Sequence, residues 1–187
     1  MQYDGQKTID FFRKVCYNII TVKDKRSPKE RIDKMSKVVM FDMDGTVYDL
    51  YGQTNWLYRL ENSDVSVYAD GAPLVNLREL EKVCRALIDN GYEIGVITWL
   101  AKNGSERFNR NTALTKKMWI ENNMPYVTKF TAQTYGTPKQ KALDKSVKLA
   151  ILVDDNKQVR EMWNTPKQRK SIDANGDIIK ALWDLLG

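Results

Sequence analysis

The chain contains no histidine and only two cysteines. The lack of histidine excludes Ser-His-Asp triads, phosphohistidine chemistry and histidine-ligated zinc. The two cysteines, Cys16 and Cys84, have no metal-binding spacing and cannot form a disulfide framework. Cys84 falls on the apolar face of an expected helix, so we interpret it as a small core residue. Any metal site must therefore use oxygen ligands.

Long apolar runs are also missing. No stretch reaches the length of a membrane span, and the N-terminus lacks the apolar region of a secretory signal. We therefore expect a cytoplasmic protein without a membrane partner. The 187 residues, of which 42% are hydrophobic, suffice for one domain with a sizeable core. The net charge of +6 is a modest excess that favours solubility over recruitment of an anionic partner, so nucleic acid is a less favoured partner.

The stretch around which the chain is organised is VVMFDMDGTV, residues 38–47. Its valine-rich apolar half predicts a strand buried on both faces, as in parallel sheets. Because strand side chains alternate, Asp42 and Asp44 should leave the strand end on one side. Gly45 allows a sharp turn there and a close approach to a ligand. Ligands of open α/β sheets bind at this end of the strands.

The Asp-x-Asp pair has other interpretations. It also opens an EF-hand calcium loop, but that loop requires glycine at its sixth position and glutamate at its twelfth. Val47 and Gln53 occupy those positions, so calcium binding of this kind is excluded. A merely acidic turn is the remaining alternative, and it is disfavoured because later segments supply partners for the pair.

Strand and helix patterns alternate along the rest of the chain, which predicts an α/β fold with a parallel sheet. Thr137 and Pro138 resemble an N-cap and a first helical position, placing Lys139 in the first turn of a short helix. Strands are expected at 38–41, 93–98, 126–131, 148–153 and 169–172, and helices at 55–60, 76–90, 105–122, 158–163 and 177–186.

Two segments stand apart from this alternation. Residues 1–35 are expected to form an amphipathic helix over 7–22 and a basic linker. The helix should pack on the domain, with a protein partner as the alternative. Residues 48–73 carry aromatic side chains that could stack on a nucleobase or seal a small lid to the core, two alternatives of equal weight. These aromatics are Tyr48, Tyr51, Trp56, Tyr58 and Tyr68.

Four segments together resemble the motifs of the haloacid dehalogenase (HAD) superfamily of phosphotransferases. They are 42–46 (DMDGT), 96–98 (VIT), 137–139 (TPK) and 151–155 (ILVDD), within a match over roughly 36–175. The resemblance implies a HAD-like Rossmannoid three-layer fold with a mainly parallel central sheet. Residues 36–187 would be the catalytic domain, and 48–73 a minimal cap insertion.

The resemblance also implies roles for individual residues. Asp42 would form an aspartyl-phosphate, and Asp44 would act as general acid and base. Carboxylates that converge without histidine or cysteine favour Mg²⁺ as the cofactor. Thr98 and Lys139 would bind the phosphoryl oxygens, with Lys141 as the alternative lysine. The expected metal ligands are Asp42, Asp44 through its backbone carbonyl, Asp154 and Asp155. Asp154 is favoured over Asp155 for direct contact with the metal. The expected substrate contacts are Gly45, Thr46, Tyr48 and Trp99.

The expected substrate is a small phosphorylated molecule. FDMDG (41–45), with Asp49 shortly after it, resembles the 5′(3′)-deoxyribonucleotidases, which favours a nucleotide. A polynucleotide end and a sugar phosphate are alternatives. A scaffold that binds phosphate or a protein without turnover is the non-enzymatic alternative, and the intact aspartate pair speaks against it.

Overall fold

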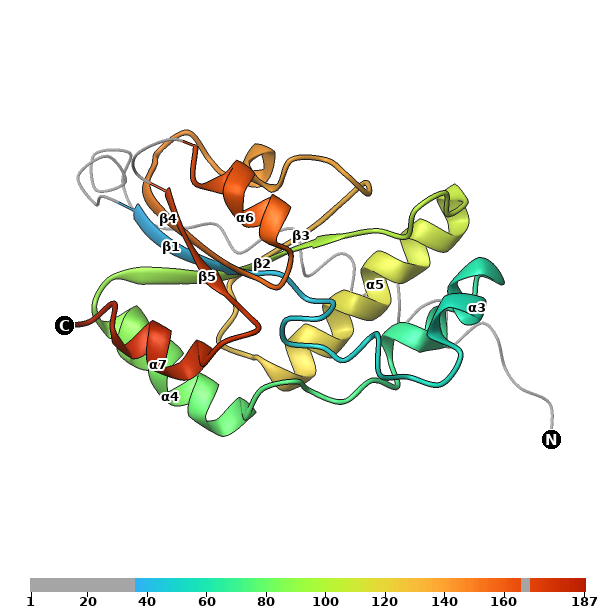
Figure 1. Cartoon of the computed structure of the whole chain (residues 1–187), viewed down its shortest axis with the longest axis horizontal. Coiled ribbons are helices and arrows are strands. Elements are labelled where there is room, and N and C mark those ends of the chain that lie inside the picture. The colour runs from blue at the N-terminus through green and yellow to red at the C-terminus, as the bar shows by residue number, and fades with distance from the viewer. Residues whose placement is uncertain (1–35, 166–168) are drawn as a thin grey trace, which may run out of the picture. The chain divides into compact units, whose positions relative to one another are not determined.

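A five-stranded parallel sheet forms the centre of the computed structural model, which describes residues 36–165 and 169–187 (Figure 1). The helix and linker expected within residues 1–35 lie outside the described residues. The strand order is β3-β2-β1-β4-β5, and each neighbouring pair is parallel. The strands are β1 (Ser36–Phe41), β2 (Tyr92–Trp99), β3 (Lys129–Gln133), β4 (Val147–Asp154) and β5 (Arg169–Asp173).

The central strand β1 is buried on both faces, as its apolar run predicts. Val39 and Phe41 belong to the larger core cluster, whereas Val38 and Met40 belong to a smaller cluster on the opposite face. Alternate residues of one strand thus anchor two cores. This arrangement confirms the predicted α/β class with a parallel central sheet.

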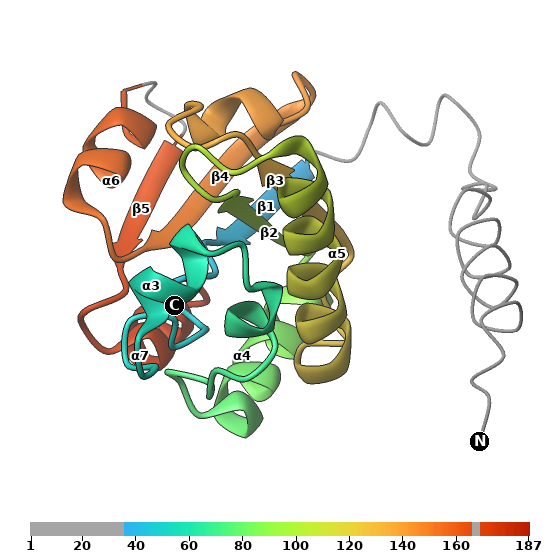
Figure 2. The ribbon, with the colours of Figure 1, turned by 90° about the vertical axis from the view of Figure 1, so that its right-hand side faces the viewer.

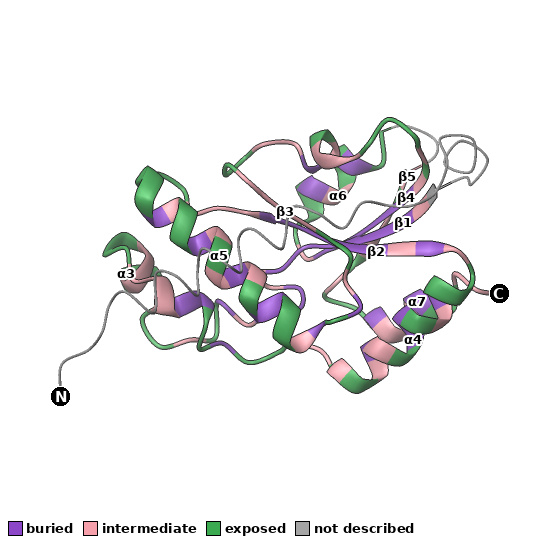
Figure 3. Cartoon of the chain, turned by 180° about the vertical axis from the view of Figure 1, so that it is seen from behind, coloured by how far each residue is buried: buried purple, intermediate pink, exposed green. Residues whose placement is uncertain are grey.

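Helices cover both faces of the sheet. The larger core receives side chains from α4, α5 and α7, and the smaller core receives them from α6 and the 3₁₀ segment η2. Figure 3 shows the buried strands between α6 on one side and α4 and α7 on the other. The elements are α4 (Leu77–Asp89), α5 (Glu106–Asn123), η2 (Lys139–Ala142), α6 (Lys157–Trp163) and α7 (Ile178–Trp183).

Most element boundaries follow local signals, and three predictions were wrong. Strand β3 begins at Lys129, three residues later than expected, because a turn in which the Val127 amide bonds the Met124 carbonyl precedes it. Thr137 is not an N-cap, since η2 follows Pro138 without a side-chain cap. The last helix ends at Trp183, short of its predicted end.

The insertion expected at residues 48–73 follows β1. It contains α3 (Trp56–Glu61) and the 3₁₀ segment η1 (Val65–Tyr68), and η1 packs against α5 (Figure 2). Arg59 braces the insertion by donating to Asp64 at 2.8 Å and to Asp70 at 2.7 Å. Within the described part of the chain, no helix combines the length and apolar character needed to cross a bilayer.

Candidate active site

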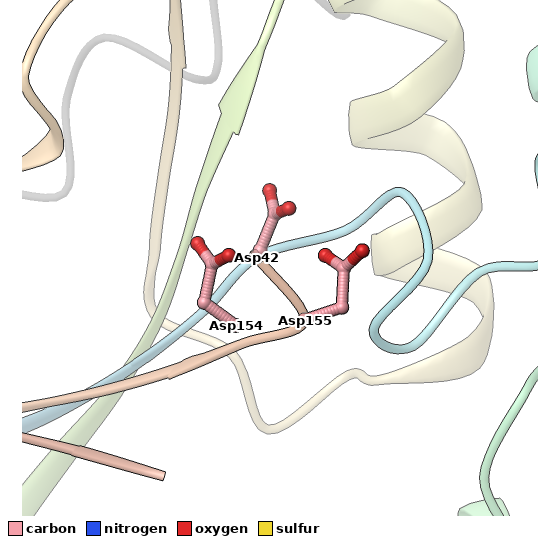
Figure 4. Close-up of side chains that lie close together, drawn as sticks. All are labelled: Asp42, Asp154 and Asp155. Atoms are coloured by element: carbon pink, nitrogen blue, oxygen red, sulfur yellow. The ribbon is translucent and has the colours of Figure 1, made fainter. Parts of the chain in front are cut away.

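Three carboxylates meet at the carboxyl edge of the sheet. Asp42 follows β1, Asp154 ends β4, and Asp155 comes next. Because β1 and β4 are parallel neighbours with Phe41 opposite Val153, their ends lie together. One carboxylate oxygen from each of the three aspartates lies within 4.8 Å of the others (Figure 4). The structure thus brings together three of the four predicted metal ligands.

The turn after β1 is built to approach Asp155 closely. Gly45 has a φ of 77°, which favours glycine, and a Cβ atom there would lie 2.9 Å from Asp155 Oδ2. Thr46 Oγ1 accepts a 3.2 Å hydrogen bond from the Asp155 backbone amide. Neither Gly45 nor Thr46 lines the cavity described below. Both residues help to place Asp155, and their contact with substrate stays a prediction.

Lys139 sits between two of the carboxylates. Its ammonium lies 2.7 Å from Asp42 Oδ1 and 2.7 Å from Asp154 Oδ2, and the side chain is 1% exposed. Burial alone would lower the pKa of Lys139, but the two aspartates raise it above its ordinary value. Lys141, the alternative lysine, is exposed. The geometry therefore brings Lys139, and not Lys141, to the carboxylates.

One ammonium does not offset all the negative charge of this cluster. Burial, together with the neighbouring Asp42, raises the pKa of Asp154 to about 6. Burial and Asp42 also raise the pKa of Asp155. The Lys139 ammonium opposes both shifts but does not outweigh burial and the neighbouring carboxylate. Three oxygen donors with unbalanced charge fit a hard divalent cation such as Mg²⁺.

The carboxylate of Asp44 has a different partner. Its Oδ2 accepts a 2.5 Å hydrogen bond from the ammonium of Lys116, and it lies outside the triad formed by Asp42, Asp154 and Asp155. Burial raises the pKa of Asp44, an effect that the nearby Lys116 ammonium opposes. Whether the Asp44 backbone carbonyl binds metal stays a prediction.

Lys116 is the site residue that sequence reasoning missed. It lies in the interior of α5 and is fully buried. Its ammonium also donates to Thr98 Oγ1 at 2.9 Å and to the Trp99 carbonyl oxygen at 2.7 Å. A signal did exist, because Lys116 follows Phe108 and Thr112 at four-residue steps on the buried face of the helix. Thr98, predicted to bind phosphate, is thereby joined to Asp44.

A cavity of about 570 Å³ opens onto Asp42 and Asp44. Trp99, predicted to contact the substrate, lines this cavity, and its indole donates to the Thr137 carbonyl oxygen at 2.8 Å. Two aromatic pairs face the cavity, each with ring centroids 5.1 Å apart. The aromatic lining residues are Tyr51, Trp56, Tyr68, Trp99 and Tyr135.

Tyr48, predicted to contact the substrate, does not line this cavity. Its side chain is fully buried, and its ring lies edge-on to Trp119 with centroids 5.1 Å apart. The hydroxyl donates to the Val67 carbonyl oxygen at 2.6 Å and accepts from the Gly71 amide at 2.8 Å. The prediction for Tyr48 was wrong, because this residue fastens the insertion to the core.

Comparisons with known proteins give matches among solved structures alone. No protein-family model matches the chain, and a search of curated proteins finds no match either. Among solved structures, one similar chain is a D,D-heptose 1,7-bisphosphate phosphatase from Burkholderia thailandensis. It is 15% identical with a TM-score of 0.47, and the match covers 81% of this chain and 99% of that one. At this distance, function must be inferred from the site itself.

Proposed function

We propose that the protein is a magnesium-dependent phosphomonoester hydrolase of the HAD type, acting through an aspartyl-phosphate on Asp42. One observation carries this proposal. Asp42 belongs both to the triad with Asp154 and Asp155 and to the wall of a cavity that it shares with Asp44. A nucleophile, a cation site and a proton donor therefore adjoin one space.

The side chains divide the chemistry between them. Lys139 bonds Asp42 Oδ1, so Oδ2 is the oxygen that attacks phosphorus. As the Asp42–phosphorus bond forms, the ester P–O bond breaks and Asp44 gives its proton to the leaving oxygen. In the second step water attacks phosphorus, Asp44 takes the water's proton, and the bond to Asp42 breaks. The raised pKa of Asp44 suits it to carry that proton.

The remaining groups would offset negative charge on the phosphoryl oxygens. Mg²⁺ would be held by Asp42, Asp154 and Asp155, with the Asp44 carbonyl as a further ligand. When bound, it would offset charge on the phosphoryl oxygens. Lys139 adds a second positive charge. Thr98 is fully buried and is joined to the site through the hydrogen bond that it accepts from Lys116.

We further propose a nucleotide as the substrate class, because of the character of the cavity wall. Tyr51, Trp56 and Tyr68 of the insertion line the cavity, whereas Tyr48 is buried and Tyr58 is 66% exposed. Aromatic rings facing a cavity can stack on a planar base. Among the described lining residues, Lys102 is the single cation, which gives a polynucleotide backbone few contacts.

Hydrolysis of an aryl phosphate tests the reaction. The purified full chain should release phosphate with Mg²⁺ and lose this activity with a chelator. Asp42→Asn should abolish turnover, because an amide cannot form the acyl-phosphate. If no divalent cation supports turnover, the scaffold alternative is favoured and the proposed reaction is wrong.

A substrate panel tests the nucleotide. Nucleoside 5′- and 3′-monophosphates, oligonucleotides with terminal phosphates and sugar phosphates should be compared side by side. Trp56→Ala should raise KM for the best nucleotide about tenfold, since stacking on one base contributes roughly 1–3 kcal/mol. Ribose 5-phosphate should be unaffected by this change. Tyr58→Ala, on the same helix but exposed, is the matched control. A preference for sugar phosphates would exclude the nucleotide.

A further inference from the structure

The ring of Tyr51 borders the carboxylate cluster. Tyr51 belongs to the insertion after β1 and lines the same cavity as Asp42 and Asp44. A Cβ atom on Gly45 would lie 2.6 Å from Tyr51 Cε2 and 2.9 Å from Asp155 Oδ2. Cε2 is bonded to the ring carbon that carries the hydroxyl, so the hydroxyl-bearing edge of the ring and the Asp155 carboxylate are neighbours beside the turn. A glycine in the turn leaves room for both.

We propose that Tyr51 is a substrate-binding residue whose hydroxyl donates a hydrogen bond to a phosphoryl oxygen beside Asp155. This inference deepens the proposed phosphatase function and rests on it. Lys139 forms its ion pairs with Asp42 and Asp154. The insertion would thus supply a neutral donor next to the carboxylate of the triad with which Lys139 forms no ion pair among the described residues.

The hydroxyl of Tyr51 is available to a ligand. Within the described part of the chain it forms no hydrogen bond, and Tyr51 is 51% exposed. The ring packs against the Gly45 turn and lies edge-on to Trp56, with centroids 5.1 Å apart. A ring fixed from two sides loses little conformational entropy when its hydroxyl binds, which favours binding.

The phosphoryl group is the part of the substrate that would come next to Asp155. Asp42, the proposed nucleophile, belongs to the same triad, so the group that it attacks must lie beside the triad. Phosphoryl oxygens carry negative charge, and a hydroxyl bonds such an acceptor more strongly than a neutral one. Thr98, the hydroxyl expected to bind phosphate, is fully buried and does not line the cavity. Tyr51 offers a hydroxyl that does.

Tyr51→Phe tests the assignment, because it removes the hydroxyl and keeps the ring. With Mg²⁺ present, the dissociation constant of inorganic phosphate, measured by calorimetry, should rise about tenfold, since a hydrogen bond to a charged group is lost. The value of kcat/KM should fall by a similar factor for a nucleoside monophosphate, ribose 5-phosphate and an aryl phosphate, because all three share the phosphoryl group. The midpoint of urea unfolding without ligand should stay the same, since the hydroxyl bonds no described residue.

Tyr58→Phe is the matched control. Tyr58 belongs to the same insertion, is 66% exposed and does not line the cavity. This variant should bind phosphate and hydrolyse all three esters as the wild type does. An equal loss in both variants would mean that the hydroxyl of Tyr51 has no particular role and would overturn the assignment.

Two further results would overturn it. Unchanged phosphate binding in Tyr51→Phe would show that the hydroxyl does not contact the phosphoryl group. A loss confined to the nucleotide would show that it contacts the nucleoside instead.

The binding measurement separates this inference from the proposed function. If the wild type binds phosphate but hydrolyses no ester, the phosphatase function is wrong, and the effect of Tyr51→Phe on phosphate binding still decides the role of Tyr51. If the wild type neither binds phosphate nor hydrolyses an ester, both proposals are wrong. Weaker phosphate binding together with a common loss on all three esters supports the assignment.

Discussion

Two buried lysines serve the candidate site in different ways. Lys139 reaches it from η2 and joins two carboxylates, whereas Lys116 reaches it from α5 and joins one carboxylate to two neutral oxygens. Both side chains are almost completely buried. Their aspartate partners, Asp42 and Asp44, lie two residues apart on one turn.

The difference lies in what each ammonium does for its partners. Lys139 reduces the net negative charge of the triad, a task that a divalent cation also performs. Lys116 instead orients the groups around it, because its ammonium donates to a carboxylate, a hydroxyl and a backbone carbonyl. Another cation can replace the positive charge of Lys139. The hydrogen bonds of Lys116 depend on a donor placed at the position of its ammonium. The two lysines should therefore respond differently to metal and to pH.

The largest expected effect is on turnover. Lys139→Met should lower kcat/KM about 10³-fold, because charge compensation at the phosphoryl group is lost. The loss should be similar for alkyl and aryl phosphates, since phosphoryl charge develops with both. Rates of the purified variant on both substrates measure it. A strong dependence on the leaving group would mean that Lys139 governs proton transfer and would contradict its role in charge compensation.

The second-largest expected effect is on the free energy of unfolding of the two lysine variants in the absence of metal. In the presence of a chelator, Lys139→Met should lower the free energy of unfolding by about 3–5 kcal/mol, because it leaves two buried carboxylates without their cation. Lys116→Met should cost about 1–3 kcal/mol, because Asp44 is partly exposed and loses one charge-assisted bond.

Mg²⁺ should reverse the order of the two losses, so that Lys116→Met becomes the less stable variant. Mg²⁺ replaces the charge of Lys139 at the triad but does not reach Asp44 Oδ2, so only Lys139→Met should recover. Urea titrations of both variants, with Mg²⁺ and with chelator, measure the change. Equal recovery of both variants would show that their roles are interchangeable.

The pH dependence of the magnesium effect tests the charge at the triad. The pKa of Asp154 is raised from 3.8 to about 6 in the folded protein. Between about pH 4 and pH 6 the metal-free folded state therefore binds more protons than the unfolded state, and its stability falls as pH rises. Mg²⁺ competes with these protons and should raise Tm by several degrees more at about pH 7 than at about pH 5.

Two variants complete that experiment. Asp154→Asn should weaken both the magnesium effect and its pH dependence, because it removes one ligand of the cation and the carboxylate with a pKa of about 6, while Asp155 remains. Lys116→Met should keep both, since Lys116 does not contact the triad. A magnesium effect of the same size at both pH values in the wild type would contradict the assigned cation site.

Local sequence signals determine most of the fold. The valine-rich run of β1 predicted a strand buried on both faces, and Asn76 and Ser105 cap their helices through side-chain hydrogen bonds. Such signals lie within a few residues of the feature that they predict. The Met124–Val127 turn shifted β3 because the apolar side chains of Met124 and Tyr126 enter the core without forming a strand.

The candidate site was predictable where chain order alone decides position. Asp42 and Asp154 end neighbouring parallel strands, so their convergence follows from the topology. Tyr48 was misplaced because its partner, Trp119, lies on a helix far along the chain. Lys116 was missed for the same reason, since its acceptors on the ends of β1 and β2 are brought to α5 only by tertiary packing.

The smallest expected effect belongs to the two lysines that adjoin this pair in sequence. Lys117 is 30% exposed beside Glu121 at 3.4 Å, and Lys141 is exposed at the η2 surface. Substituting either by Met should change kcat/KM less than twofold and the free energy of unfolding by less than about 0.5 kcal/mol, because surface charges contribute little. Enzyme assays and urea titrations of Lys117→Met and Lys141→Met, run beside the buried pair, provide the measurement. A loss at either neighbour as large as that at Lys116 or Lys139 would mean that position in the chain, rather than burial against an aspartate, sets the importance of these lysines.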